Sequence, residues 1–315
     1  IIMKNVILLG YKGLGANLLH LSYCHQISIK YGPVTIITLC ETLKEVLYND
    51  PKISDVIYLD KYYKKFSDIF KLGKFLSKEK IDNIFIFYPS IRFFLASKIA
   101  RIKNINCYPF LNKKNLHLVK AAKKFTEKVL NIKDCPTETK IYIDKNNQNK
   151  EKNNIKKNRI NVMLGIGSSG PTTRWGSKNF IQLINFLNKE NKFFFFLLCG
   201  PNEKNIADEI LKHTKSENCL SLHTRKISEI VPLISLTNIY IGNDSFGHHI
   251  ACQCNIPSII MILDTPRAYT DYSVKQFRVL PEGQKDDDIT HDSRFLPETI
   301  EVKKVIEKVN FILKL

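Results

Sequence analysis

Short apolar runs alternate with segments of helical spacing along the first half of the chain. We expect strands at residues 6–9, 34–39, 56–59 and 83–88, and helices at 17–31, 42–48 and 66–80. The apolar runs do not alternate with polar residues, which indicates strands buried on both faces, as in a parallel sheet covered by helices. Such sheets bind ligands at the carboxyl ends of their strands, so the glycine-bearing turn at residues 10–17 lies where chemistry is expected.

The same alternation restarts after residue 158. We expect strands at 160–164, 193–199, 239–241 and 258–263, and helices at 179–188, 203–215, 227–236, 246–254 and 297–314. Between the halves, residues 144–158 carry five lysines against two acidic residues, and Ile155 is the only apolar side chain. Such a segment has nothing to bury. The sequence therefore predicts an α/β protein with a first domain over 1–143, a solvated linker over 144–158 and a second domain over 159–315.

A length of 315 residues, 44% of them hydrophobic, is enough for two domains with cores of their own. The two longest apolar runs, 193–199 and 256–263, are far shorter than the roughly 20 residues of a membrane-spanning helix. The beginning of the sequence lacks the plan of a signal peptide. Eight cysteines are scattered without Cys-x-x-Cys spacing, which predicts reduced, mostly buried thiols, no metal site and a cytoplasmic location.

The formal net charge is +18, from 48 basic and 30 acidic residues, and three interpretations compete for it. Specific nucleic-acid binding is disfavoured, because lysine and asparagine are spread along the chain instead of forming an arginine-rich patch with interleaved aromatic residues. Attraction to an anionic membrane face and to phosphorylated lipid substrates is the second interpretation. The third is that these charges only solvate the surface. Composition leaves the second and third open.

A glycine- and serine-rich turn follows the strand expected at 160–164. Residues 165–170 read GIGSSG and fit the dinucleotide-binding pattern G-x-G-x-x-G, but residues 171–175 read PTTRW where a helix should begin directly. A dehydrogenase is therefore disfavoured. Small residues still allow backbone N–H groups to approach an anion, and hydroxyl groups add donors. Arg174 could meet a diphosphate with a fixed fork of donors, or it could be an ordinary surface arginine.

The stretch GNDSFGHHIA at residues 242–251 combines the end of a strand, a polar cluster and the beginning of a helix. The first N–H groups of a helix are unpaired and carry partial positive charge, so they can hold a phosphate group. Asp244 or Ser245 could instead be a simple helix N-cap. An N-cap does not explain two adjacent histidines, although His249 could be a histidine satisfied within the core.

Four segments together carry a resemblance to a known family. These are INVMLGIGSS…TTRWGSKNFIQL, FFFFLLCGPNEKNIADEI, the stretch ending IYIGNDSFGHHIACQCNIPSIIMI, and the opening VILLGYKGLGANLLHLSYCHQISIKYG with DPKISDVIYLD. They resemble the bacterial heptosyltransferases of glycosyltransferase family 9. The resemblance implies a GT-B fold, with two Rossmann-like domains that face a central cleft. It implies an acceptor on the first domain and a nucleotide-sugar donor on the second. It further implies inverting transfer of heptose from ADP-heptose to the lipopolysaccharide core, at the inner face of the cytoplasmic membrane, with no cofactor and no essential metal.

The resemblance also implies site residues by position. The donor-binding residues would be Ser168, Ser169, Thr172, Thr173, Arg174, Gly200, Glu203, Asp244, Ser245, Gly247, His248 and His249. Among them, Arg174 stands where the family has lysine and would also act in catalysis, and Glu203 would reach the ribose or base. The acceptor-side loop would contain Lys12, Gly13, Gly15 and Asn17.

Three positions depart from the family pattern. Ala16 occupies the place of the aspartate proposed as general base, Gly176 that of a proline and Phe246 that of a glycine. His20, four residues after Ala16 and so on the same helix face, is a candidate for the missing base, although it could also be a histidine packed on the sheet. Because the aspartate is absent, a catalytically inactive relative that binds a nucleotide sugar is the alternative to an active glycosyltransferase.

Overall fold

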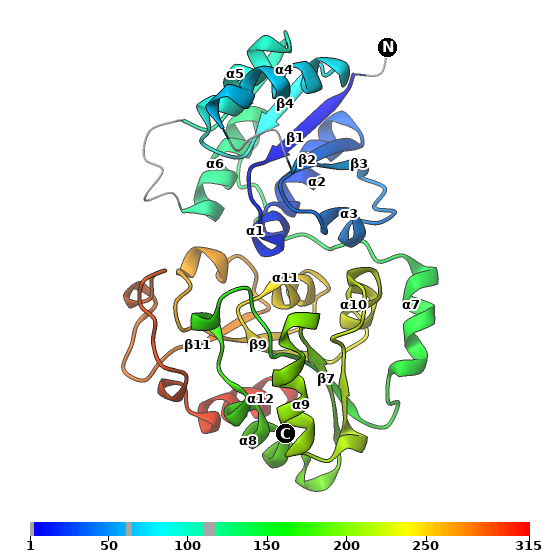
Figure 1. Cartoon of the computed structure of the whole chain (residues 1–315), viewed down its shortest axis with the longest axis vertical. Coiled ribbons are helices and arrows are strands. Elements are labelled where there is room, and N and C mark those ends of the chain that lie inside the picture. Colours follow the sequence, from blue (N-terminus) through cyan, green and yellow to red (C-terminus); the bar gives the residue numbers. More distant parts are fainter. Residues whose placement is uncertain (1–2, 61–64, 110–116) are drawn as a thin grey trace. The chain divides into compact units, whose positions relative to one another are not determined.

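The computed structural model describes residues 3–60, 65–109 and 117–315, and the chain divides into two compact units, Ile1–Tyr142 and Ile143–Leu315. Each unit contains one parallel sheet with helices packed on it (Figure 1). The α/β class expected from the sequence is therefore confirmed. We refer to the two parts as unit 1 and unit 2.

Unit 1 is built on a five-stranded sheet of order β3-β2-β1-β4-β5. Its strands are β1 (Asn5–Leu9), β2 (Val34–Thr38), β3 (Ile53–Tyr58), β4 (Asn83–Ile86) and β5 (Asn104–Cys107). Its helices are α1 (Leu14–Leu19), α2 (Leu21–Tyr31), α3 (Leu43–Val46), α4 (Ile69–Lys78), α5 (Ile91–Ile99) and α6 (Leu118–Leu130), with the 3-10 turn η1 (Phe66–Asp68) before α4. β1, β2 and β4 are buried along their whole length, which explains why apolar residues dominate them without alternating with polar ones.

Helices cover both faces of the unit 1 sheet. On one face, Leu72 of α4 and Ala96 of α5 belong to the same apolar cluster as Val6 of β1. On the other face, α2 and α6 are neighbours (Figure 1): Tyr23 of α2 stacks on Phe87, which follows β4, and its hydroxyl donates a hydrogen bond to a carbonyl oxygen of α6. Apolar side chains thus pack on both faces of the sheet, and the polar side chains of Asn5 and Asn83 within it are paired by a hydrogen bond of 2.7 Å.

Unit 2 is built on a six-stranded sheet of order β11-β10-β9-β6-β7-β8. Its strands are β6 (Ile160–Gly165), β7 (Phe193–Leu198), β8 (Cys219–Ser221), β9 (Ile239–Asn243), β10 (Ser258–Met261) and β11 (Gln276–Val279). Its main helices are α7 (Lys145–Glu151), α8 (Ser177–Leu187), α9 (Lys204–Lys212), α10 (Ile227–Ile234), α11 (Phe246–Gln253) and α12 (Val302–Leu313). The order reverses between β6 and β9, the point at which open parallel sheets bind ligands beyond their carboxyl ends. The glycine-bearing stretches at residues 165–170 and 242–251 follow β6 and β9, so both leave the sheet at this point.

The strands expected from the sequence are all present, with bounds shifted by a few residues. Two expectations are wrong. The solvated linker over 144–158 contains α7, which packs beside α10 within unit 2, so the boundary between the units lies at residues 142–143. The single helix expected over 17–31 is two helices, α1 and α2, which meet at His20. None of the helices among the described residues is long and apolar enough to cross a membrane.

Candidate functional site

The β6 loop, which joins β6 to α8, is shaped by its own hydroxyl groups. Ser168 Oγ donates a hydrogen bond to the carbonyl oxygen of Gly170 at 2.6 Å, and Thr173 Oγ1 donates one to Ser168 Oγ at 2.6 Å. Ser168 is buried, whereas Ser169 and Thr172 are exposed. Ser168 and Thr173 therefore fix the turn, and Ser169 and Thr172 present their hydroxyls to solvent.

Glu203, at the beginning of α9, ties the β6 loop to the end of β7. Its Oε1 accepts a hydrogen bond from the Ser168 amide at 2.8 Å, and its Oε2 accepts one from the Gly200 amide at 3.0 Å. A Cβ at Gly167 would lie 2.0 Å from Glu203 Oε2, so the close approach of the carboxylate requires glycine there. The structure thus assigns Glu203 a supporting role, and its predicted contact with a ribose or base stays a prediction.

Arg174 is the cation at this end of the sheet. Its Nη2 donates to Glu203 Oε1 at 2.9 Å and to the carbonyl oxygen of Ser168 at 3.1 Å. Its Nε is buried and makes no hydrogen bond with any residue that the structure describes. A buried donor without an acceptor costs about 1–3 kcal/mol, so the site lacks an acceptor that a bound anion would supply.

Asn243, the last residue of β9, locks the β6 loop to the neighbouring strand. It is fully buried, accepts a hydrogen bond from the Trp175 amide at 2.8 Å and donates one to the carbonyl oxygen of Ile166 at 2.9 Å. Gly176, which stands where the family has proline, has a φ of 90°, a conformation that proline cannot adopt. The sequence analysis did not single out Asn243, although its place at a strand end beside Asp244 was a signal.

The beginning of α11 leaves backbone donors without a side-chain cap. Ser245 is the N-cap residue by position, but its side chain makes no capping bond and lies 3.2 Å from the Tyr240 hydroxyl instead. The next glycine, Gly247, packs so closely that a Cβ there would lie 2.6 Å from the Leu198 side chain. The structure therefore does not support the interpretation of Ser245 as a simple N-cap. The first amides of α11 remain suited to an anion.

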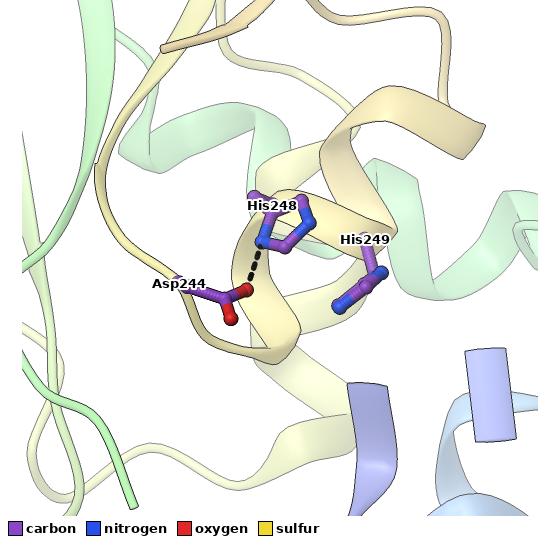
Figure 2. A group of neighbouring side chains, drawn as sticks. All are labelled: Asp244, His248 and His249. Carbon is purple, nitrogen blue, oxygen red and sulfur yellow. Dashed lines mark ion pairs between the residues drawn. The ribbon is translucent and has the colours of Figure 1, made fainter. Parts of the chain in front are cut away.

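Asp244, His248 and His249 gather at this helix end (Figure 2). Asp244 Oδ1 lies 3.2 Å from His248 Nδ1, and His249 Nδ1 lies 2.6 Å from the Tyr272 hydroxyl. Burial raises the pKa of Asp244 to about 6, an effect that a hydrogen bond with Thr265 partly offsets. Burial lowers the pKa of His249 to about 3 and that of His248 well below its usual value. Both imidazoles are therefore neutral at pH 7.

The acceptor-side loop of unit 1 is held by Asn17. Asn17, buried in α1, donates hydrogen bonds to the carbonyl oxygens of Tyr11 and Gly13 at 2.9 and 2.8 Å. Its own oxygen accepts a hydrogen bond from Thr38 Oγ1 at 2.6 Å. Gly15 lies in α1 itself. Asn17 is thus a support for the loop and not a group presented to a ligand.

A cavity of about 330 Å³ opens beside this loop, at the carboxyl ends of β1, β2 and β4. It is lined by Gly10, Tyr11, Lys12, Leu39, Tyr88, Ser90, Arg92 and Phe93. The backbone of Gly10 lies against the Tyr88 ring, where a Cβ would come within 2.4 Å. Lys12 is among the residues expected from the sequence. Tyr88 and Arg92 are not, because Tyr88 ends an apolar run with no polar motif beside it and Arg92 lies beyond the last element expected in this half.

The candidate base His20 lies in the core of unit 1. Its side chain is fully buried, and its ring stacks on that of Tyr11 with centroids 4.8 Å apart. Its Nδ1 donates to the carbonyl oxygen of Ala16 at 2.6 Å, which leaves Nε2 as the unprotonated nitrogen, with no hydrogen bond inside the described parts of the chain. Burial lowers the pKa of His20 to about 4. This placement favours the packed-histidine alternative, and the catalytic role stays a prediction.

Replacing His20 with alanine separates the two roles. A general base contributes on the order of 10²–10⁴-fold to turnover, so the catalytic prediction requires a loss of that size per folded molecule. A packing role predicts a lower free energy of unfolding with turnover unchanged. Turnover and urea denaturation should therefore be measured on the same preparation, and unchanged turnover would reject His20 as the base.

Comparison with known proteins identifies the family to which the chain belongs. The sequence model of glycosyltransferase family 9 (heptosyltransferase) matches residues 107–290, more than half of the chain. The chain belongs to glycosyltransferase family 9. The match includes the β6 loop, Glu203 and the beginning of α11, so the interacting side chains described in unit 2 lie within the family's own segment.

Individual family 9 proteins support the same fold. Lipopolysaccharide heptosyltransferase 1 of Campylobacter coli is 24% identical over 165 residues, which are 50% of this chain and 48% of that protein. The chain thus spans about half the length of this curated relative. The structure of E. coli ADP-heptose lps heptosyltransferase II has a TM-score of 0.77 at 17% identity, over 99% of this chain and 98% of that one. E. coli heptosyltransferase WaaC with ADP has a TM-score of 0.72 at 12% identity, over 98% and 100%. These likenesses confirm the expected GT-B fold of two Rossmann-like domains.

Proposed function

We propose that this family 9 protein is a glycosyltransferase that moves a sugar from a nucleotide-diphosphate sugar to a surface-glycan acceptor. ADP-heptose is the favoured donor, and a lipopolysaccharide core or another lipid-linked glycan is the favoured acceptor, in line with the names of its relatives. The transfer inverts the anomeric centre and needs no cofactor and no metal. Specific nucleic acid is not among the proposed partners.

The buried, unpaired Nε of Arg174 carries the proposal for unit 2. A departing nucleoside diphosphate gains negative charge in the transition state, and donors aimed at that charge are what such a reaction needs. Arg174, the exposed hydroxyls of Ser169 and Thr172, and the uncapped amides of α11 are donors of this kind. Together they suit a diphosphate better than a neutral ligand.

The cavity of unit 1 suits an anionic, sugar-like acceptor. Its lining combines the cations Lys12 and Arg92 with the rings of Tyr88 and Phe93. Cations favour phosphate or carboxylate groups, and aromatic faces favour the apolar faces of sugar rings. These are the groups that a phosphorylated core glycan presents.

A thermal-shift panel of ADP-, GDP-, UDP-, dTDP- and CMP-linked sugars tests the donor. A ligand that binds only the folded protein stabilises it by about 2.7 kcal/mol at 100 times its Kd, so ADP-heptose should raise the melting temperature most. An equal response to all five compounds would contradict nucleotide recognition. Transfer of radiolabelled heptose to a lipopolysaccharide-core acceptor then tests the reaction itself.

Ala16 favours a second candidate, a relative that binds the nucleotide sugar without transferring it. The side chain of Ala16 cannot accept a proton. This candidate predicts the same thermal shift with ADP-heptose but neither transfer nor donor hydrolysis. Measurable turnover would reject it.

We also propose that the protein works in the cytoplasm, in peripheral contact with the anionic inner face of the membrane. The turn η1 and the exposed side of α4 and α5 are called here the α4–α5 face. Phe66 of η1 and Phe70 of α4 are 65% and 71% exposed. Residues 65–101 hold eight basic and three acidic side chains. Each basic side chain near an anionic bilayer contributes about 1 kcal/mol, and exposed phenylalanine can insert among the headgroups.

Replacing both Phe66 and Phe70 with serine should weaken binding to phosphatidylglycerol vesicles by at least about tenfold, because burying one phenylalanine is worth about 1.5–3 kcal/mol. Co-sedimentation with vesicles measures the effect. The matched control is Phe311→Ser on α12, where the side chain is 73% exposed but residues 298–314 hold four basic against three acidic side chains. Equal losses in both variants would contradict the choice of the α4–α5 face.

A further inference from the structure

Three metal-ligating side chains meet at the beginning of α11 without the help of a cysteine. Asp244, His248 and His249 each offer one ligand atom, and these atoms all lie within 4.8 Å of one another. Figure 2 shows the carboxylate directed at the His248 ring, with the His249 ring beside it. The expectation of no metal site was based on the spacing of the cysteines. It does not apply to this cluster, which contains no cysteine.

One pair of ligand atoms has the separation that a shared ion requires. Bonds of about 2.0–2.2 Å to a tetrahedral or octahedral centre place neighbouring ligand atoms about 3.0–3.5 Å apart. Asp244 Oδ1 and His248 Nδ1, at 3.2 Å, already have this separation. His249 is oriented through its other nitrogen, since Nδ1 is bonded to the Tyr272 hydroxyl at 2.6 Å. Histidine ligands in metal sites are commonly held by a hydrogen bond of this kind.

His248 supplies a second, independent observation. Its side chain is fully buried, and neither ring nitrogen has a partner in good hydrogen-bond geometry among the residues that the structure describes. The backbone groups of Ser245 and Tyr269 also lie near the ring and interact with it. His248 Nδ1, which lies 3.2 Å from Asp244 Oδ1, is the ring nitrogen placed to bind an ion together with this carboxylate.

We propose that Asp244, His248 and His249 bind a divalent transition-metal ion of the Zn²⁺ class. Two imidazole nitrogens and one carboxylate oxygen suit Zn²⁺ or Ni²⁺, whereas Mg²⁺ and Ca²⁺ prefer oxygen ligands alone. Three protein ligands leave a coordination position open. Catalysis as proposed above needs no metal, so the ion is an added ligand of the site and not part of the reaction.

The open coordination position has a consequence that depends on the proposed function. The ion would lie at the end of α11 whose amides are suited to a diphosphate. A phosphate oxygen can complete the coordination of the ion, so bound Zn²⁺ should strengthen ADP binding and slow the release of the product nucleotide. Zinc would then inhibit turnover while tightening nucleotide binding.

Competition with a chromophoric zinc chelator tests the site on the whole chain, without any assay of activity. We expect wild-type protein to bind one equivalent of Zn²⁺ and His248→Asn to bind it at least about tenfold more weakly, since even the loss of a supporting partner costs 10–100-fold. All eight cysteines remain in this variant, so any zinc that they bind is measured as background. His213→Asn, at an exposed histidine after α9, is the control that should bind as wild type. Equal zinc affinity of wild type and His248→Asn would overturn the site.

Two further measurements keep the outcomes distinct. Tyr272→Phe keeps all three ligands but removes the hydrogen bond to His249, and it should weaken zinc about tenfold even if His248→Asn fails to fold. ADP affinity is then measured by calorimetry with and without Zn²⁺. Tighter ADP binding with zinc in wild type but not in Tyr272→Phe supports the coupling, and unchanged ADP affinity overturns it. Zinc binding without any ADP binding contradicts the proposed function and leaves the metal site standing.

Discussion

Replacing Arg174 with alanine should lower the rate of sugar transfer by on the order of 10²–10³-fold, the loss typical when one donor to a developing negative charge is removed. The guanidinium is partly exposed, and its Nε has no acceptor in the described structure. A charge that strengthens in the transition state makes this interaction stronger there than in the ground state, so kcat should fall more than affinity for the donor. Steady-state kinetics at saturating donor measures the effect.

Arg174→Lys is the informative companion to the alanine variant. Lysine stands at this position in the family pattern, so the charge is retained while the fork of donors is lost. We expect this variant to keep a large part of the rate. Because Arg174 also holds Glu203, thermal melting must show that the alanine variant is still folded. Equal rates for wild type and the alanine variant would remove Arg174 from the catalytic site.

Replacing Gly242 with alanine should destabilise unit 2 by about 3 kcal/mol, at the upper end of the usual cost of overpacking. Gly242 in β9 pairs with Gly165 in β6, and a Cβ on Gly242 would lie 2.5 Å from the Gly165 Cα. The obstacle is backbone, so no side-chain rotation can relieve it. Separation of the two strands would also displace both loops that leave the sheet there.

Trp175, the only tryptophan in the sequence, is buried in unit 2, so its fluorescence follows the unfolding of this unit in urea. Gly170→Ala is the matched control. The nearest atom to a Cβ there is 3.9 Å away, and its φ of −116° is acceptable to any residue, so the change should stay within about 0.5 kcal/mol of wild type. Similar midpoints for the two variants would show that β6 and β9 adjust to the extra methyl group.

Uninterrupted apolar runs made the fold predictable from the sequence. β7, which reads FFFFLL, and β1, which reads NVILL, could be recognised because both faces of each strand are buried. α7, which reads KNNQNKE, could not, because it has no apolar residue to mark a periodicity. Its helix instead depends on the side chain of Asp144, which caps the Asn147 amide at 3.0 Å, and on a hydrogen bond from Gln148 to Ser235.

The candidate site was predictable in its location but not in its division of roles. The glycine-rich turn and the polar cluster marked the ends of β6 and β9 correctly. The sequence could not show that Glu203 binds the amides of Ser168 and Gly200, because one of these partners lies 35 positions away. Nor could it show that Asn243 joins two strand ends, or that the helix carrying His20 breaks at that residue.

The support of the β6 loop by side chains of unit 2 alone has a consequence for the evolution of such a chain. The side chains that brace the β6 loop, Glu203 and Asn243, belong to the same unit as the loop. Recombination of genes near the boundary at residues 142–143 would therefore exchange the amino-terminal unit and leave this bracing intact. If unit 2 binds the donor and unit 1 the acceptor, as proposed, such an exchange would change the glycan that is extended and leave the choice of activated sugar unaltered.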